Sequence, residues 1–92
     1  FMRKVEQRIV LPTIQGLEKD KIPYVGFIFI GLMNVDGDPY VIEYNARLGD
    51  PETEVIIPRI ANDLVDVLEL AGKKELDKAK VVLRPETATT VV

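Results

Sequence analysis

The dipeptide Asp36-Gly37 lies between two strand-like stretches, and it constrains the fold of this chain more than any other feature. Residues 24–35 are mostly β-branched, aromatic or apolar, whereas residues 40–47 alternate between apolar or small side chains and polar ones. An Asp-Gly pair between two such stretches is a strong signal for a tight turn. Residues 24–47 are therefore predicted to form a β-hairpin. Its first strand is apolar on both sides and is expected to be covered on both faces.

Two glycines and a proline limit how the strands of this hairpin can pair. Gly26 and Gly31 weaken the first strand, and they indicate either a bulge or the close approach of another group. Pro39 can open the second strand but cannot lie in its middle, because proline has no backbone N–H to donate. The second strand is therefore predicted to run from residue 40 to residue 45 or 47.

Helices are predicted on both sides of the hairpin. Apolar side chains recur every three to four positions over residues 2–19, which predicts a helix that Pro12 kinks or splits. After the hairpin, Asp50 is typical of an N-cap and Pro51 of a first helical residue. Pro58 would limit that helix to about two turns.

The last third of the chain is predicted to hold one more helix and two short β runs. Asn62-Asp63 can cap a helix that ends at Gly72, and residues 78–84 and 87–92 are β-like. Together these elements predict an α+β fold in which helices pack on an antiparallel hairpin.

Composition narrows the chemistry available to the chain. Its 92 residues allow one small domain at most, and 47% hydrophobic with 29% charged residues is ordinary for a globular protein. There is no cysteine and no histidine, so any metal must be a hard ion held by oxygen ligands. The net charge of −3 and the scattered Lys and Arg side chains argue against nucleic acid as a partner. No apolar run is long enough for a membrane span, and no signal-peptide pattern is present.

A row of polar side chains in the second strand is the candidate site. Glu43, Asn45 and Arg47 would share one face of a strand, about 7 Å apart from one to the next. The first two offer hard oxygen ligands suited to Mg²⁺, which usually takes only one or two protein groups and completes its shell with water and phosphate. The guanidinium would add a clamp for phosphate or carboxylate.

The spacing alone does not decide between this site and a simple solvated face. A half-exposed antiparallel strand alternates between polar and apolar side chains in any case. Likewise, Asp50-Pro51-Glu52 is most simply a helix cap, although a cap does not exclude a second role. Both interpretations stay open on the residues alone.

A longer pattern adds a specific resemblance. The stretches GFIFIGLM, VIEYNARLGDPETEVIIPRI and DLV resemble the glycinamide ribonucleotide synthetase (phosphoribosylamine–glycine ligase) family of ATP-grasp enzymes, over about residues 9–70. The Glu-x-Asn-x-Arg core is shared among ATP-grasp ligases, whereas its continuation into Gly-Asp-Pro-Glu-Thr and Val-x-x-Pro-Arg is more specific to this family. The final run, TATTVV, is similar to the strand that opens the family's small C-terminal domain. The resemblance implies that residues 1–78 are the C-terminal part of an ATP-grasp domain and that residues 79–92 begin the small β domain.

The resemblance also implies a reaction and a set of roles. ATP would phosphorylate the carboxylate of glycine, and the amine of phosphoribosylamine would attack the acyl phosphate to give glycinamide ribonucleotide, ADP and phosphate. Glu43 and Asn45 would be ligands of Mg²⁺ (or Mn²⁺), and Arg47 would be the catalytic residue that stabilises the transferring phosphoryl group. Gly49 and Asp50 would bind substrate beside the acyl phosphate. Such an enzyme of de novo purine biosynthesis is expected in the cytoplasm.

One position departs from the wider superfamily. Many ATP-grasp enzymes carry a further acidic metal ligand on the strand before the Glu-x-Asn pair, at the position that Gly31 holds here. This difference favours the synthetase family over carboxylase-type relatives, and it leaves the number of metal ions open.

We expect the chain to be a fragment of a larger protein. The family's phosphate-covering loop and adenine-binding segment lie upstream of the matched residues, so no ligase activity is expected from the chain alone. ATP, glycine and phosphoribosylamine would be partners of the parent enzyme, with no nucleic acid and no membrane. Uncovered apolar surface is expected to make the fragment self-associate through sheet edges. The alternatives are a fragment of another ATP-grasp ligase or carboxylase, and a non-catalytic α+β interaction module.

Overall fold

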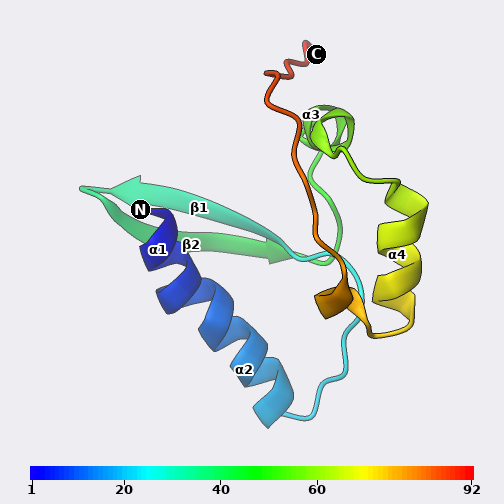
Figure 1. The fold of residues 1–92 in the computed structure, drawn as a ribbon. Coiled ribbons are helices and arrows are strands. Elements are labelled where there is room, and N and C mark those ends of the chain that lie inside the picture. The colour runs from blue at the N-terminus through cyan, green and yellow to red at the C-terminus, as the bar shows by residue number, and fades with distance from the viewer. The chain divides into compact units, whose positions relative to one another are not determined.

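The computed structural model describes residues 1–92, which fold into two compact units. The first unit comprises Phe1–Tyr24 and Ile28–Ala46, and the second comprises Val25–Phe27 and Arg47–Val92. Helices and one two-stranded antiparallel sheet make up the secondary structure, which confirms the α+β prediction (Figure 1). No helix has both the length and the apolar character that crossing a membrane requires.

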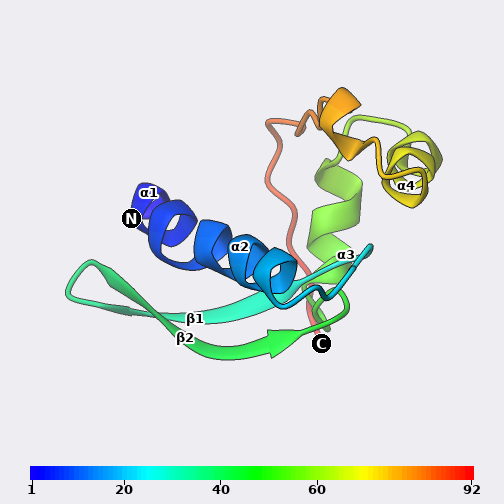
Figure 2. The same ribbon diagram turned by 90° about the horizontal axis from the view of Figure 1, so that it is seen from below.

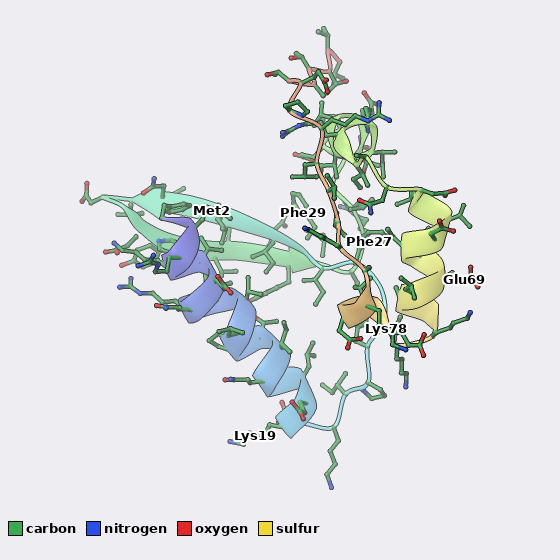
Figure 3. The ribbon with its side chains drawn as sticks, viewed as in Figure 1. Met2, Lys19, Phe27, Phe29, Glu69 and Lys78 are labelled. Carbon is green, nitrogen blue, oxygen red and sulfur yellow. The ribbon has the colours of Figure 1, made fainter.

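A long N-terminal helix opens the first unit, with Met2 at its beginning and Lys19 at its end (Figure 3). It consists of α1 (Met2–Val5), the π-helical turn η1 (Glu6–Val10) and α2 (Leu11–Lys19). The predicted irregularity near Pro12 is therefore a π-helical turn that directly precedes α2, and the helix is not interrupted. Val5 and Ile9, each 6% exposed, are the buried hydrophobic residues of the structure, and both lie in this helix.

The hairpin consists of β1 (Phe29–Val35) and β2 (Asp38–Asn45), joined by the predicted two-residue turn. Asp36 and Gly37 have φ angles of 51° and 88°, as a type I′ turn requires. The prediction that the first strand begins at residue 24 is wrong, because β1 begins at Phe29 and residues 24–28 belong to no strand. The prediction that this strand is covered on both faces is also wrong, because β1 is half-buried in its first four residues and exposed in its last three.

A β-bulge interrupts the pairing of the two strands. Gly31 pairs with Glu43 and Leu32 pairs with Val41, so Ile42 is an extra residue on β2. One of the two outcomes predicted from the glycines is thereby confirmed at Gly31. The bulge also shifts the alternation of side chains along β2, because residues on its two sides no longer follow one period of two.

The N-terminal helix covers one face of the hairpin, as Figure 2 shows. Val41 and Tyr44 are on this face, since both border a pocket of about 420 Å³ whose other lining residues belong to residues 8–20. Thr13 Oγ1 lies 3.1 Å from the hydroxyl of Tyr44 and makes a hydrogen bond with it. Alternation then places Glu43 on the opposite face, which the helix leaves uncovered within this unit.

The second unit is helical with an extended C-terminal segment. Its helical elements are α3 (Thr53–Ile56), the 3₁₀ turn η2 (Ile57–Arg59), α4 (Leu64–Gly72) and the 3₁₀ turn η3 (Leu76–Lys78). The predicted cap of α4 is confirmed, because the side chain of Asp63 accepts a hydrogen bond from the backbone N–H of Val65 at 2.9 Å. Glu69 lies on the outside of this helix and pairs with Lys73 at 2.9 Å (Figure 3).

The extended segment after η3 runs along residues 59–62. Ile60 and Leu83 form an isolated antiparallel bridge, and the Ala61 N–H donates to the Val82 carbonyl at 2.7 Å. The side chain of Asn62 donates to the Lys80 carbonyl at 2.8 Å and accepts from the Val82 N–H at 2.6 Å. The two β runs predicted here therefore yield one bridge, and no strand forms over residues 87–92.

Candidate functional site

The polar pair Glu43–Asn45 is formed at the end of β2. The Asn45 amide Nδ2 donates a hydrogen bond to Glu43 Oε1 at 3.2 Å, so the two side chains meet as their spacing predicted. Glu43 is exposed and Asn45 is half-buried. The strand register places Gly31 of β1 directly across from Glu43, and Phe29 across from Asn45. A carboxylate and an amide thus meet at the end of β2, where Asn45 also borders a pocket of about 440 Å³ with Thr13 and Leu17 of the N-terminal helix.

The donor set of this pair fits a small hard cation. Glu43 keeps a second carboxylate oxygen, and Asn45 keeps its amide oxygen, for coordination. No cluster of three or more His, Cys, Asp or Glu side chains is arranged to hold a metal. Two oxygen donors without a third acid do not make an all-protein cage of the Ca²⁺ type. They match Mg²⁺ or Mn²⁺, which keep most of their shell as water and phosphate oxygens.

Arg47 is not part of this strand face. β2 ends at Asn45, and Arg47 belongs to the second compact unit. Its Nη1 donates to the carbonyl oxygen of its neighbour Leu48 at 2.9 Å, and its side chain is exposed. Glu43 and Asn45 therefore lie on one strand as predicted, whereas Arg47 follows the end of that strand.

The loop after Arg47 forms a pocket of about 520 Å³ in the second unit. Gly49 is buried and Asp50 is exposed, and the Asp50–Pro51 peptide bond is cis. The pocket has a mixed polar and apolar lining, as a site for a small polar substrate would need. Its lining residues are Arg47, Leu48, Gly49, Asp50, Pro51, Thr53 and Glu54.

Thr53 closes this loop, and sequence reasoning missed it. Both its backbone N–H, at 3.0 Å, and its hydroxyl Oγ1, at 2.5 Å, donate to the carbonyl oxygen of Gly49. The predicted helix start is wrong, because α3 begins at Thr53 with Glu52 at the N-cap position, and Asp50 caps nothing. The signal available in the sequence was a threonine four residues after a glycine, which allows side-chain bonding back to the i−4 carbonyl.

An ion cluster fixes the turn of the hairpin to the N-terminal helix. Asp38 Oδ1 accepts hydrogen bonds from Lys4 Nζ at 2.9 Å and from Arg8 Nη1 at 3.1 Å, and Lys4 also donates to the Gly37 carbonyl at 3.2 Å. The hydrogen bond and charge of Lys4, followed by those of Arg8, lower the pKa of the Asp38 carboxyl. This cluster orients the hairpin that carries the Glu43–Asn45 pair.

A Glu-x-Asn-x-Arg sequence whose Glu and Asn side chains meet at the end of a hairpin strand is typical of the ATP-grasp class of ligases. The family described as "Phosphoribosylglycinamide synthetase, ATP-grasp (A) domain" matches residues 1–53, more than half of the chain. The chain therefore belongs to the phosphoribosylglycinamide synthetase family.

Several relatives are similar over nearly the whole chain. The phosphoribosylamine–glycine ligase of Ralstonia nicotianae is 48% identical over 90 residues, which are 97% of this chain and 21% of that protein. The ligase of the same name from Chlorobaculum tepidum is 43% identical over 91 residues, which are 99% of this chain and 21% of the relative. The bifunctional purine biosynthetic protein PUR2,5 of Pichia angusta is 38% identical over 93 residues, which cover 100% of this chain and 12% of that protein. The chain thus spans about one fifth or less of the length of these relatives.

Proposed function

We propose that this chain is part of an ATP-dependent ligase that joins glycine to 5-phosphoribosylamine, through a glycyl phosphate, in de novo purine biosynthesis. Family membership and the names of the relatives support this proposal. The observation that carries it is the hydrogen-bonded Glu43–Asn45 pair at the end of β2. The proposal includes a cytoplasmic location, and a division in which residues 1–78 complete the ATP-grasp domain and residues 79–92 begin the small domain.

In this proposal Glu43 and Asn45 hold the metal that accompanies ATP. Bound Mg²⁺ or Mn²⁺ neutralises charge on the phosphate oxygens during phosphoryl transfer. The contact between Asn45 Nδ2 and Glu43 Oε1 keeps the two side chains together at the end of the strand, so that a turn of the Asn45 amide would bring its oxygen towards a cation held by Glu43. The Glu43 side chain is exposed, which leaves room for the waters and phosphate oxygens that such a cation retains.

The segment that follows would handle the reacting groups. Arg47 has an exposed guanidinium whose remaining N–H donors can bind the transferring phosphoryl group. Gly49 and Asp50 line the 520 Å³ pocket, where a buried glycine and an exposed carboxylate suit the acyl phosphate and the incoming amine. Catalysis would rest on positioning and on stabilisation of the charge that develops, as in phosphoryl transfer generally.

A chimaeric ligase tests the proposal directly. Residues 1–92 of this chain replace the matching 90-residue segment of the Ralstonia nicotianae ligase, and ADP release is measured with ATP, glycine and phosphoribosylamine. We expect turnover that depends on all three substrates. Glu43→Gln and Arg47→Ala should each lower kcat/KM by on the order of 100-fold, because the first removes the carboxylate proposed to hold the metal and the second removes the guanidinium proposed to meet the developing phosphate charge. Glu18→Gln, which makes the same charge change on the N-terminal helix, is the matched control.

The result that would overturn the proposal is a chimaera with full activity in both Glu43→Gln and Arg47→Ala. The chain by itself is expected to show no turnover in the same assay, since it spans about a fifth of the ligases it matches. Turnover above background by the isolated chain would contradict that expectation.

A further inference from the structure

We propose that Gly31 is a positioning residue for Glu43. The space left by its missing side chain is where the Glu43 side chain folds to meet the Asn45 amide. The inference rests on the proposed function, because it concerns the pair proposed to hold the metal. Gly31 lies on β1, directly across the hairpin from Glu43, whereas both proposed metal ligands lie on β2.

The evidence is the distance that a side chain at position 31 would create. A Cβ atom built on Gly31 would lie 3.2 Å from Glu43 Cγ, 3.8 Å from the Glu43 carbonyl oxygen and 3.9 Å from its backbone nitrogen. The two backbone distances are ordinary contacts, whereas the contact with Cγ is tighter than packed carbons normally allow. The crowding therefore falls on the Glu43 side chain and leaves the strand pairing intact.

Backbone conformation does not explain the glycine. Gly31 pairs within β1 and is absent from the residues with positive φ, so any L-amino acid could adopt its conformation. Glycine weakens a strand, so its presence at this position needs another reason. Gly16 in α2 makes a useful contrast, because a Cβ there would meet no atom within 4 Å.

The bulge next to Gly31 makes the position more sensitive. It begins between Gly31 and Leu32, and it brings the Gly31–Glu43 pair to the end of the regular ladder that continues to Asn45. The Glu43 side chain lies over Gly31 and reaches along β2 to Asn45 at 3.2 Å. A methyl group at position 31 would require Glu43 Cγ to move by a few tenths of an ångström, and this shift would lengthen the contact between Oε1 and the Asn45 amide, which is already 3.2 Å.

The test compares Gly31→Ala with Gly16→Ala in the metal-free chimaeric ligase. Crystal structures are expected to show Glu43 Oε1 beyond hydrogen-bond reach of Asn45 Nδ2 in Gly31→Ala, and unchanged in Gly16→Ala. Binding of Mn²⁺ alone, followed by electron paramagnetic resonance, should weaken by about 10-fold in Gly31→Ala, as expected when a group that orients a ligand is altered. The melting temperature should rise less in Gly31→Ala than the better strand propensity of alanine alone would give, because the crowding at Glu43 Cγ offsets part of that gain.

A double variant keeps the inference testable if Gly31→Ala unfolds the protein. Glu43→Ala removes Cγ and with it the crowding, so Gly31→Ala should then have no destabilising effect in the Glu43→Ala background. Equal effects of Gly31→Ala in both backgrounds, or an unchanged Glu43–Asn45 contact in Gly31→Ala, would overturn the inference.

The metal-free crystal structures report on positioning whether or not the ligase reaction is correct. Failure of the proposed function would appear instead as full activity in Glu43→Gln and Arg47→Ala. The two failures can therefore be told apart.

Discussion

Replacement of Thr53 by valine should loosen the Gly49–Asp50 loop by a predictable amount. Thr53→Val keeps the shape of the side chain and removes only the hydroxyl that donates to the Gly49 carbonyl at 2.5 Å. The carbonyl is not left unsatisfied, because the backbone N–H of the same residue still donates to it at 3.0 Å. The cost is therefore one ordinary net hydrogen bond, about 1 kcal/mol, and not the larger penalty of an orphaned buried group.

Amide hydrogen exchange measures this loss at the bond that closes the loop. A local destabilisation of about 1 kcal/mol raises the population of the open loop about fivefold, so the Thr53 amide should exchange about fivefold faster in Thr53→Val. Thr53→Ser keeps the hydroxyl and is the matched control, expected to stay close to the original protein. The Ala61 amide, which donates to Val82 at 2.7 Å in the same unit, should not change and serves as an internal reference.

Two results would refute this reasoning. Equal protection of the Thr53 amide in the valine and serine variants would show that the hydroxyl does not hold the loop. Faster exchange at both Thr53 and Ala61 would show that the whole unit had been destabilised. In the chimaeric ligase, a loosened loop should lower kcat/KM for glycine and phosphoribosylamine more than for ATP, because Gly49 and Asp50 are the residues proposed to meet those two substrates.

Three other features of the chain give testable consequences. Because Lys4 and Arg8 lower the pKa of Asp38 below 3.8, the stabilisation that they give is complete above that value and is lost as the pH falls through the lower folded pKa. Asp38→Asn should therefore lower the melting temperature at neutral pH and make the melting temperature fall less steeply as the pH is lowered. The same acid dependence of the melting temperature in the variant and the original protein would contradict this. Asn62→Ala removes two hydrogen bonds to the segment after η3, so it should release that segment by about 1–2 kcal/mol and speed tryptic cleavage after Lys80. Asn62→Asp, which keeps the acceptor for Val82, should have a smaller effect, and equal cleavage rates would refute the assignment. Tyr40 is 58% exposed and Ile42 is 63% exposed, and such apolar surface favours self-association. We therefore expect the isolated chain to sediment as species larger than its monomer mass of 10.3 kDa. A monomer at micromolar concentration would contradict this expectation.

The sequence predicted local structure well where a short-range signal decides the outcome. Asp36-Gly37 fixes the turn because both residues must take positive φ, and Asp63 caps α4 because its oxygen can reach an N–H two residues on. Proline at position 12 removes a donor in any fold, but the sequence does not show that a π-helical turn would absorb the loss.

Elements that depend on a distant partner were predicted less well. Residues 24–28 have the composition of a strand and none of the pairing, because composition cannot supply a neighbouring strand. Residues 78–84 formed a single bridge for the same reason. Asp50 resembled an N-cap, yet the helix begins three residues later, where the Thr53 side chain closes the loop.

The candidate site was predicted in part. Alternation along a strand correctly brought Glu43 and Asn45 together, since both lie beyond the bulge and within regular pairing. The same alternation failed for Arg47, which follows the end of β2. Thr53 was missed because its role depends on loop geometry, which sequence spacing alone does not determine.

The extra residue Ile42 gives the hairpin an unequal tolerance to changes in chain length. Removal of Ile42 would restore plain pairing while leaving Val41 towards the helix and Glu43 towards the open side. Removal of Tyr44 would instead make Glu43 and Asn45 adjacent in the chain and turn them to opposite sides of the sheet. Proteins of this family that carry a one-residue gap at Ile42 could keep the oxygen pair, whereas a gap two positions later would abolish it.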